Sequence, residues 1–511
     1  MVKQKGRIIA KYLEYCICCL FFITVCVEGF AQSRFTKTSA QLAKLKNLQA
    51  AVESNPESIK NHETFLKALL PDDPYLKSQY AVWLKRFPKS SAVPFSIGKH
   101  LVSFLYPEGS GYLLKAVELK PGYAEAWYLL GANAEISGNT LSQEYMANAK
   151  KAEPENPKYA MSYAYSFKNT DSARFDSLLL AVAFRFPESA EAPLALTFLA
   201  LNSQNENEKI AFYEQLYKRY SAKPSQSSSF GIESYYHYLL DKNPKKAFDI
   251  ALNMVLEPKV NHYQWSENLN LARTVRDVRS MMDQNKPALV LEMLRALPAS
   301  YQNDERYVLV RTEAIEATLD SKAAYDTLSL FYAKQPGTRG RTALLAYAKK
   351  LGKDEQQVDI EIQNMRESSA APATDFSLEQ YYKGGRTSLA DHKGKIVLLT
   401  HWFPACGPCR AEFPHLDSVV KKFDSKDVAY LGINAARNQD AHVLPFMSST
   451  GYSFIPIKEE PSRDKGNLDY DGVPQNYLID QKGRIIFSNF RIDETNEDML
   501  KMMISELLKH K

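Results

Sequence analysis

The chain has 511 residues, with 64 lysines and arginines, 59 aspartates and glutamates, and 45% hydrophobic residues. At roughly 150 residues per domain, this length excludes one compact core and predicts two to four structural units. A net charge of +5 is too small to suggest a nucleic-acid partner.

The first 31 residues have the layout of a secretory signal. Four basic side chains precede the apolar run Tyr15–Val27, and Gly29 and Ala31 follow in a small-x-small cleavage pattern. The run is shorter than the roughly 20 residues that a membrane-spanning helix needs, which disfavours a permanent anchor. The residues before Cys26 are not the small ones that lipid attachment requires. We expect cleavage after Ala31 and export, with the mature protein in the periplasm.

The six cysteines point to chemistry at one place. Four of them fall in the predicted signal, so the mature chain keeps only Cys406 and Cys409. A structural disulfide normally closes a long loop, and two randomly placed cysteines would lie three apart in roughly one case in 240. We therefore interpret this pair as a functional dithiol.

Residues 32–366 have helical character and an internal period. Pro88, Pro121, Pro154 and Pro187 are each 33 residues apart. The residues eight and five positions before each proline are apolar: Tyr80 and Trp83, Leu113 and Ala116, Met146 and Ala149, and Leu179 and Val182. Those two positions share a helix face, and the proline then stops the helix. The period predicts a solenoid of helix pairs that bury their apolar faces by stacking.

Within this region, Trp127, Leu130 and Gly131 have the W-x-x-L-G spacing of tetratricopeptide repeats. The segment resembles that family most clearly over residues 80–200. A period of 33 also suits ankyrin repeats, but their T-P-L-H turn does not occur here. The resemblance implies a concave face that binds a peptide or protein partner. The alternative is that the repeats are only a spacer or a dimer face.

A short small-residue linker is expected at residues 367–373, and a different domain at residues 374–511. The expected elements of this domain are a buried strand over Lys395–Phe403, a helix over Cys409–Phe423, a strand over Val428–Ile433, a hairpin turning at Lys482-Gly483 and a helix over Glu497–Lys509. This order predicts an α/β fold. The fold class is therefore multidomain, an all-α repeat solenoid followed by an α/β domain.

The sequence Cys406-Gly-Pro-Cys409 lies between the predicted buried strand and the following helix. Unpaired backbone N–H groups and the helix dipole at a helix N-terminus favour a thiolate, which predicts Cys406 as the attacking sulfur. Pro408 suits the first helical turn, where its missing N–H costs nothing. Cys409 would then lie on the inner side and resolve a mixed disulfide.

With this context, the domain resembles the thioredoxin superfamily and, within it, the exported TlpA/ResA-type thiol-disulfide oxidoreductases. The resemblance rests on ATDFSL, on GKIVLLTHW leading into CGPCRAEFPHL, and on DGVPQNYLIDQKGRIIF. It implies a cis-proline at Pro474, beside the dithiol, with Val473 and Trp402 contacting substrate. It also implies that Glu412 is the conserved helix glutamate. Glu412 lies three residues after Cys409, so it shares a helix face with that thiol and could move its proton.

The sequence also departs from general thioredoxins. Thr400 replaces their buried aspartate, and Ala405 replaces the tryptophan before the first cysteine. Acid-base help is therefore expected from Glu412 or from solvent. His401 lies on the predicted buried strand and is interpreted as a core histidine rather than a proton shuttle. A peroxiredoxin would have a threonine where this chain has Phe403, which disfavours peroxidase activity.

A cysteine pair can also serve other functions, such as metal binding. A zinc site would need two more ligands, and neither His401 nor His415 has finger spacing, so no metal or other cofactor is expected. The Gly-Pro dipeptide occurs in the reducing member of the superfamily and favours a disulfide reductase. Such an enzyme would act on disulfide-containing protein clients and take electrons from an upstream membrane donor. The alternative is a repeat-based scaffold or adaptor whose dithiol is secondary.

Overall fold

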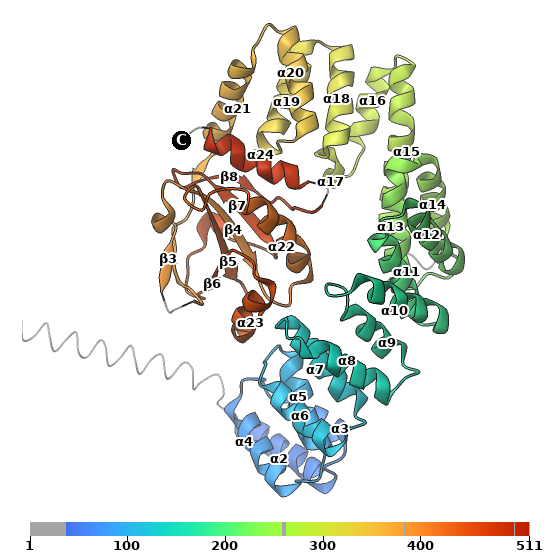
Figure 1. Ribbon diagram of the computed structural model, residues 1–511, viewed down its shortest axis with the longest axis vertical. Helices are drawn as coiled ribbons and strands as arrows, with labels where there is room; N and C mark the ends of the chain where they lie inside the picture. The colour runs from blue at the N-terminus through green and yellow to red at the C-terminus, as the bar shows by residue number, and fades with distance from the viewer. Residues whose placement is uncertain (1–36, 258–261, 383–384, 495, 510–511) are drawn as a thin grey trace, which may run out of the picture. The chain divides into compact units, whose positions relative to one another are not determined.

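A computed structural model describes residues 37–257, 262–382, 385–494 and 496–509 (Figure 1). The predicted signal, residues 1–31, lies outside the described residues. The chain divides into two compact units, one up to Leu130 and one from Gly131 onward.

The first unit is helical. Its helices are α2 (Ser39–Ser54), α3 (Ile59–Leu66), α4 (Pro74–Arg86), α5 (Ala92–Ser103), α6 (Gly109–Leu119) and the first half of α7 (Ala124–Ile136). The second unit begins with the rest of α7 and continues through more helices. These are α8 (Leu141–Ala152), α9 (Pro157–Tyr165), α10 (Ser172–Arg185), α11 (Glu191–Asn202), α12 (Glu206–Tyr220), α13 (Gln226–Lys242), α14 (Pro244–Leu256), α15 (His262–Asp283), α16 (Pro287–Arg295), α17 (Ala299–Gln302), α18 (Glu305–Thr318), α19 (Ser321–Lys334), α20 (Thr338–Lys350) and α21 (Glu355–Ser369).

The four periodic prolines each follow the end of a helix by two residues, after α4, α6, α8 and α10. The residues eight and five positions before each proline are buried, as predicted from their shared helix face. Gly131 lies where α7 approaches α8, and a Cβ atom built on it would come within 2.9 Å of the Met146 side chain. This glycine is therefore needed for close helix packing.

The C-terminal part is a mixed sheet with flanking helices. The elements are β1 (Ala371–Pro372), β2 (Ser377–Glu379), β3 (Arg386–Ser388), η1 (Ala390–His392), β4 (Ile396–Trp402), α22 (Gly407–Val420), β5 (Val428–Asn434), η2 (Arg437–Gln439), α23 (Asp440–Thr450), β6 (Ile455–Lys458), η3 (Gly466–Leu468), β7 (Gln475–Ile479), β8 (Arg484–Ser488) and α24 (Glu497–Leu508). The main sheet has the order β1-β8-β7-β4-β5-β6. Strands β4, β5 and β6 run parallel, whereas β7 is antiparallel to β4 and β8 is antiparallel to β7.

Strand β4 is central and every one of its residues is buried, as its apolar sequence predicted. Successive side chains alternate between the two faces of the sheet. Leu398 and Trp402 face the core shared with α22, α23 and α24, whereas Val397 and Leu399 face the core closed by Phe376, Leu378 and Leu468. The N-terminus of α22 consequently follows the carboxyl end of a strand that is buried along its whole length.

The junction between the repeats and the sheet is more structured than the predicted linker. Helix α21 continues to Ser369, and Ala371 and Pro372 pair with β8 as strand β1. Glu367, within the predicted linker, forms an ion pair with Arg484 of β8 at 3.1 Å. The linker residues therefore belong to the packed unit, because partners on β8 hold them.

Helix α21 also contacts the C-terminal helix. Arg366 Nη1 lies 2.6 Å from Glu506 Oε2 of α24, and the arginine Nε donates to the Ala333 carbonyl at 2.9 Å. The Arg366 guanidinium lies 5.1 Å from the centroid of the Phe487 ring on β8. Figure 1 shows α24 between the sheet and helices α19 to α21. The last repeat helices thus pack directly on the α/β fold.

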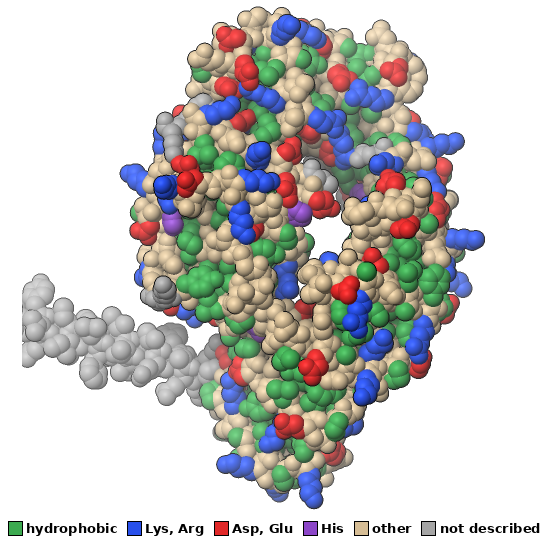
Figure 2. Space-filling view, in the orientation of Figure 1, with side chains coloured by type: hydrophobic (Ala, Val, Ile, Leu, Met, Phe, Trp, Pro, Cys, Tyr) green, Lys and Arg blue, Asp and Glu red, His purple; other side chains and the backbone are tan. Residues whose placement is uncertain are grey.

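No helix among the described residues combines the length and the apolar character needed to cross a membrane. On the face seen in Figure 2, lysine and arginine side chains are interspersed with aspartate and glutamate. Among the described side chains visible there, lysine and arginine form no continuous stripe of the kind that follows a nucleic-acid backbone.

Candidate functional site: a disulfide at a helix N-terminus

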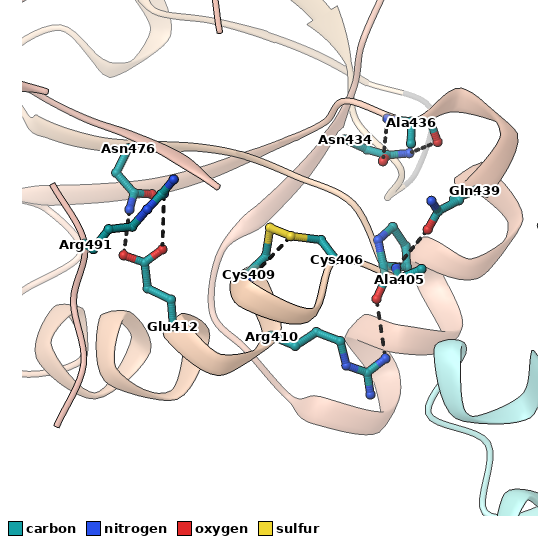
Figure 3. Close-up of a disulfide and its surroundings, with 11 residues drawn as sticks. Ala405, Cys406, Cys409, Arg410, Glu412, Asn434, Ala436, Gln439, Asn476 and Arg491 are labelled. Atoms are coloured by element: carbon teal, nitrogen blue, oxygen red, sulfur yellow. Dashed lines mark hydrogen bonds and ion pairs between the residues drawn. A yellow bond between two sulfur atoms is a disulfide. The ribbon is translucent and has the colours of Figure 1, made fainter. Parts of the chain in front are cut away.

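The two cysteines form a disulfide at the start of α22, with 5.3 Å between their Cα atoms (Figure 3). Cys406 is the N-cap residue, and its sulfur accepts a hydrogen bond from the Cys409 backbone N–H at 3.2 Å. Pro408 lies in the first turn of the helix. A thiolate on Cys406 would be stabilised by that N–H group and by the helix dipole.

Residues before the motif are held by a side chain that sequence reasoning missed. The Ala405 backbone N–H donates to Gln439 Oε1 at 2.8 Å, and the Gln439 side chain is buried. Arg410 Nη1 donates to the Pro404 carbonyl at 3.4 Å. These bonds fix the loop that carries Cys406. Gln439 has no motif spacing to the cysteines, so no sequence signal pointed to it.

Glu412 lies on the same helix as the dithiol and is buried, not exposed to solvent. Its Oε1 accepts hydrogen bonds from Asn476 Nδ2 and from the Ile492 N–H, both at 2.8 Å. Its Oε2 lies 3.9 Å from Arg491 Nη1. Burial raises the pKa of Glu412, while these hydrogen bonds and Arg491 act in the opposite direction. A carboxyl with a raised pKa accepts a proton more readily than an exposed glutamate does.

The inner face of α22 covers further buried polar groups. Thr400, at the position of the thioredoxin aspartate, is fully buried and lies directly across from Asn476 in the β4–β7 pair. Tyr430 of β5 is buried, and burial followed by the charge of Glu412 raises its pKa well above the ordinary value. Thr400 Oγ1 and the Tyr430 hydroxyl have no hydrogen-bond partner in the described parts of the chain. Glu412 is the buried carboxyl that accepts a hydrogen bond from Asn476, whereas Asp417, also buried on α22, accepts hydrogen bonds from Ser453.

Trp402 does not fit the predicted substrate-binding role. It is fully buried, and its ring packs against Phe413, Phe446 and Phe454 with centroid distances of 5.1 to 5.3 Å. The reason is strand alternation, which points residue 402 to the face covered by α22 and α23. Trp402 supports the core beneath the disulfide instead of contacting a client.

His401 is a core histidine, as predicted. It is fully buried, and its ring packs 4.4 Å from that of Tyr470. Burial, together with the nearby Arg463, lowers the pKa of His401 to about 3. The ring is therefore uncharged at neutral pH and points to the sheet face opposite α22.

The Val473–Pro474 peptide bond is cis. The next residue, Gln475, pairs with His401 at the carboxyl end of β4, so Pro474 lies one strand away from the segment leading to Cys406. Val473 also lines an open cavity of about 480 Å³ together with Asp471, Gln475 and Arg491. This surface lies beside the start of β7, where an extended chain could approach.

We expect the Glu412→Gln variant to be more stable than the wild type at neutral pH, with a gain that disappears below the ordinary glutamate pKa. The folded-state pKa of Glu412 is raised, so the folded protein binds this proton more tightly than the unfolded chain. The stabilisation that the folded protein gains from binding this proton is present at low pH, and it is lost as pH rises through the folded-state pKa of Glu412. The amide of the variant would keep the acceptor oxygen without the charge.

The measurement for this variant is hydrogen exchange in peptides covering α22 and β7 of the oxidised protein, compared between pH 4 and pH 8. A gain that is the same at every pH, or largest at low pH, would contradict the raised pKa. Asp417→Asn is a matched control from the same helix, because the pKa of Asp417 is lowered and its substitution should have the opposite pH trend.

No group of three or more histidine, cysteine, aspartate or glutamate side chains within the described ranges is arranged to hold a metal ion. The chemistry available at this site is that of two sulfurs at a helix N-terminus and one buried carboxyl on the same helix.

Comparison with known proteins agrees with this geometry. Residues 370–488 match the AhpC/TSA family. The chain is 32% identical over 119 residues to the thiol-disulfide oxidoreductase ResA of Bacillus subtilis. The aligned segment covers 23% of this chain and 65% of ResA. The chain is 34% identical over 125 residues to the thioredoxin-like protein YneN of the same organism, covering 24% of this chain and 69% of YneN.

A solved thioredoxin domain of a thiol-disulfide oxidoreductase from Bacteroides vulgatus is 25% identical and covers 27% of this chain and 94% of that domain, with a TM-score of 0.24. The family match falls on the C-terminal part. Through that part, the chain belongs to the AhpC/TSA thioredoxin-like family, alongside the ResA-type thiol-disulfide oxidoreductases.

Proposed function

We propose that this protein reduces disulfide bonds of exported proteins through Cys406 and Cys409. The observation that carries the proposal is the redox pair itself, a disulfide whose first sulfur caps α22 and accepts a backbone N–H. A sulfur in this position is stabilised as a thiolate when the bond is reduced. The name of one relative, the thiol-disulfide oxidoreductase ResA, supports the same reaction class.

The reaction has two exchange steps. The Cys406 thiolate attacks one sulfur of a client disulfide, forming a mixed disulfide and releasing the first client thiolate. Cys409 then loses its proton and attacks Cys406 Sγ, which restores the Cys406–Cys409 bond and releases the second client thiolate. Two electrons pass to the client. A membrane donor of dithiol type would supply two electrons to regenerate the reduced enzyme.

Glu412 is proposed as the group that takes up and returns the Cys409 proton. Its burial, raised pKa and position one turn after Cys409 support this role. Val473 and Pro474 are proposed as the site where the client backbone pairs, from the resemblance to the superfamily and from their place beside the β4 end. The Gly-Pro dipeptide supports the reducing direction.

Export to the periplasm is proposed from the layout of residues 1–31 and from the absence of other cysteines in the mature sequence. The helical repeats are proposed to bind a protein partner, because stacked helix pairs present an extended surface. If the dithiol proves secondary, the second candidate is an adaptor whose repeats organise other proteins.

The Cys409→Ser variant should accumulate mixed disulfides between Cys406 and its clients, because the resolving thiol is missing. The adducts would be isolated from the exporting host under acid quench, and mass spectrometry would identify the proteins attached. The Cys406→Ser/Cys409→Ser double variant sets the background. Adducts no more abundant than in the double variant would refute reduction of protein disulfides and leave the adaptor function.

A further inference from the structure

The amide of Asn476 is held in one orientation inside the protein. Asn476 is the second residue of β7 and is fully buried. Its Nδ2 donates to Glu412 Oε1 at 2.8 Å (Figure 3). The same nitrogen also donates to the Phe490 carbonyl at 3.1 Å. Both amide hydrogens therefore have acceptors. Rotating the amide by half a turn would place its oxygen against two acceptors, which determines the orientation.

The carboxyl of Glu412 is consequently asymmetric. Oε1 accepts two N–H donors, from Asn476 and from the Ile492 backbone. Oε2 is buried and makes no hydrogen bond to any residue that the structure describes, with Arg491 at 3.9 Å. An oxygen that already accepts two hydrogen bonds is the poorer place for a proton. The proton that this carboxyl binds therefore belongs on Oε2.

The other charged and titratable groups around Glu412 come from several elements. Arg491 and Asp493 follow β8 and act in opposite directions on the pKa of Glu412, and Tyr430 faces it from β5. Cys409 lies one turn earlier in α22. Tyr430 stays neutral, since its pKa is raised well above the ordinary value. Asn476 is thus the one buried side chain in the described structure that donates directly to the carboxyl.

We propose that Asn476 is a positioning residue for the dithiol reaction: its amide directs the exchangeable proton of Glu412 to Oε2 and keeps the carboxyl acidic enough to release it. This inference rests on the proposed proton-transfer role of Glu412 and specifies what tunes that role. A hydrogen bond to the ionised form lowers a carboxyl pKa, whereas burial alone raises it. Without Asn476, the carboxyl of Glu412 would hold its proton more tightly and would be less available to accept one from Cys409.

Two substitutions distinguish the effect of the Asn476–Glu412 hydrogen bond from the effect of the Asn476 side-chain shape. Asn476→Ala removes the donor, and we expect the pKa of Glu412 to rise by about one pH unit. Asn476→Asp keeps the shape but places a second carboxyl against Glu412, and we expect a rise of about two units. Gln475→Ala is the matched control, because Gln475 is the neighbouring β7 residue and its amide donates to Asn489 instead.

The first readout is carbon-13 NMR of protein labelled at glutamate side-chain carboxyls, with the Glu412 signal identified by its loss in Glu412→Gln. The second is the midpoint potential of the disulfide from pH 5 to pH 9 in dithiothreitol buffers. We expect a change of slope at the Glu412 pKa that moves upward in both Asn476 variants and stays in place in Gln475→Ala. If Asn476 had a purely structural role, the pH of this slope change would be the same in the Asn476 variants as in the wild type.

An unchanged Glu412 titration in folded Asn476→Asp would overturn the proposal, and so would a slope change that does not follow the titration. If Asn476→Ala fails to fold, the Asp variant still provides the test, because it has nearly the same shape. Failure of the proposed function is seen separately, as absence of client adducts in Cys409→Ser, whereas the titration and the potential can be measured in either case.

Discussion

Replacing Cys406 by serine should lower disulfide exchange by roughly a thousandfold or more, because a serine hydroxyl cannot serve as the thiolate nucleophile. Because Cys406 is the N-cap residue, the Cys409 N–H donates to the Cys406 sulfur. The helix dipole also stabilises the thiolate form of Cys406. Both cysteines are buried in the oxidised protein, but Cys406 is the N-cap residue whereas Cys409 lies inside the first turn of the helix. The two sulfurs should therefore differ in reactivity.

The measurement is reduction of insulin by the mature protein with dithiothreitol as the electron source. In parallel, the reduced wild type would be treated briefly with iodoacetamide at pH 7, and the label should be found on Cys406. Ser449→Ala is a suitable control, since it changes a hydroxyl on α23 and leaves both sulfurs in place. Labelling mainly at Cys409, or equal activity of wild type and Cys406→Ser, would contradict the assignment of the attacking sulfur.

The second large effect is expected at the contact between the repeats and the sheet. The Arg366→Ala variant should lose about 3–5 kcal/mol in free energy of unfolding, because it leaves the partly buried Glu506 carboxylate without its cationic partner. The two side chains are 3% and 15% exposed, and the Ala333 carbonyl would also lose its donor. The packing of the guanidinium on Phe487 would be lost as well.

Urea unfolding of the oxidised protein, with hydrogen exchange reporting on α21 and α24, would measure this loss. Arg185→Ala is the matched control, because the Arg185–Glu155 pair is 52% and 75% exposed and should contribute less than about 1 kcal/mol. The double variant Arg366→Met/Glu506→Met should recover much of the loss, since it removes both charges. Equal effects of Arg366→Ala and Arg185→Ala would show that the contact is not formed in solution.

Much of the fold could be predicted because it depends on local signals. The apolar run at Ile396–Trp402 indicated the central strand, and the prolines marked helix ends through their missing N–H groups. The turn at Lys482-Gly483 was correctly placed, since Gly483 has a φ of 80°, which favours glycine. The position of the cysteine pair between strand and helix followed from the same elements.

The supporting side chains of the site could not be predicted in this way. Gln439 reaches Ala405 across 34 residues, and Asn476 reaches Glu412 across 64 residues. Neither lies at a helical or strand spacing from its partner, so only the packed structure brings them together. Trp402 was misassigned because position beside a reactive motif was given more weight than strand alternation, which determines the face a side chain occupies.

The two-residue strand β1 has a consequence for solubility. It lies along the outer edge of β8, and Pro372 has no N–H to offer to another strand. Exposed strand edges are templates for pairing between molecules, and natural sheets block them with short strands and prolines. A thioredoxin-like fragment cut after residue 373 would expose the edge of β8 to a second molecule. Ala371 and Pro372, which connect the repeats to the sheet, thereby cover part of the β8 edge and disfavour its pairing with a second molecule.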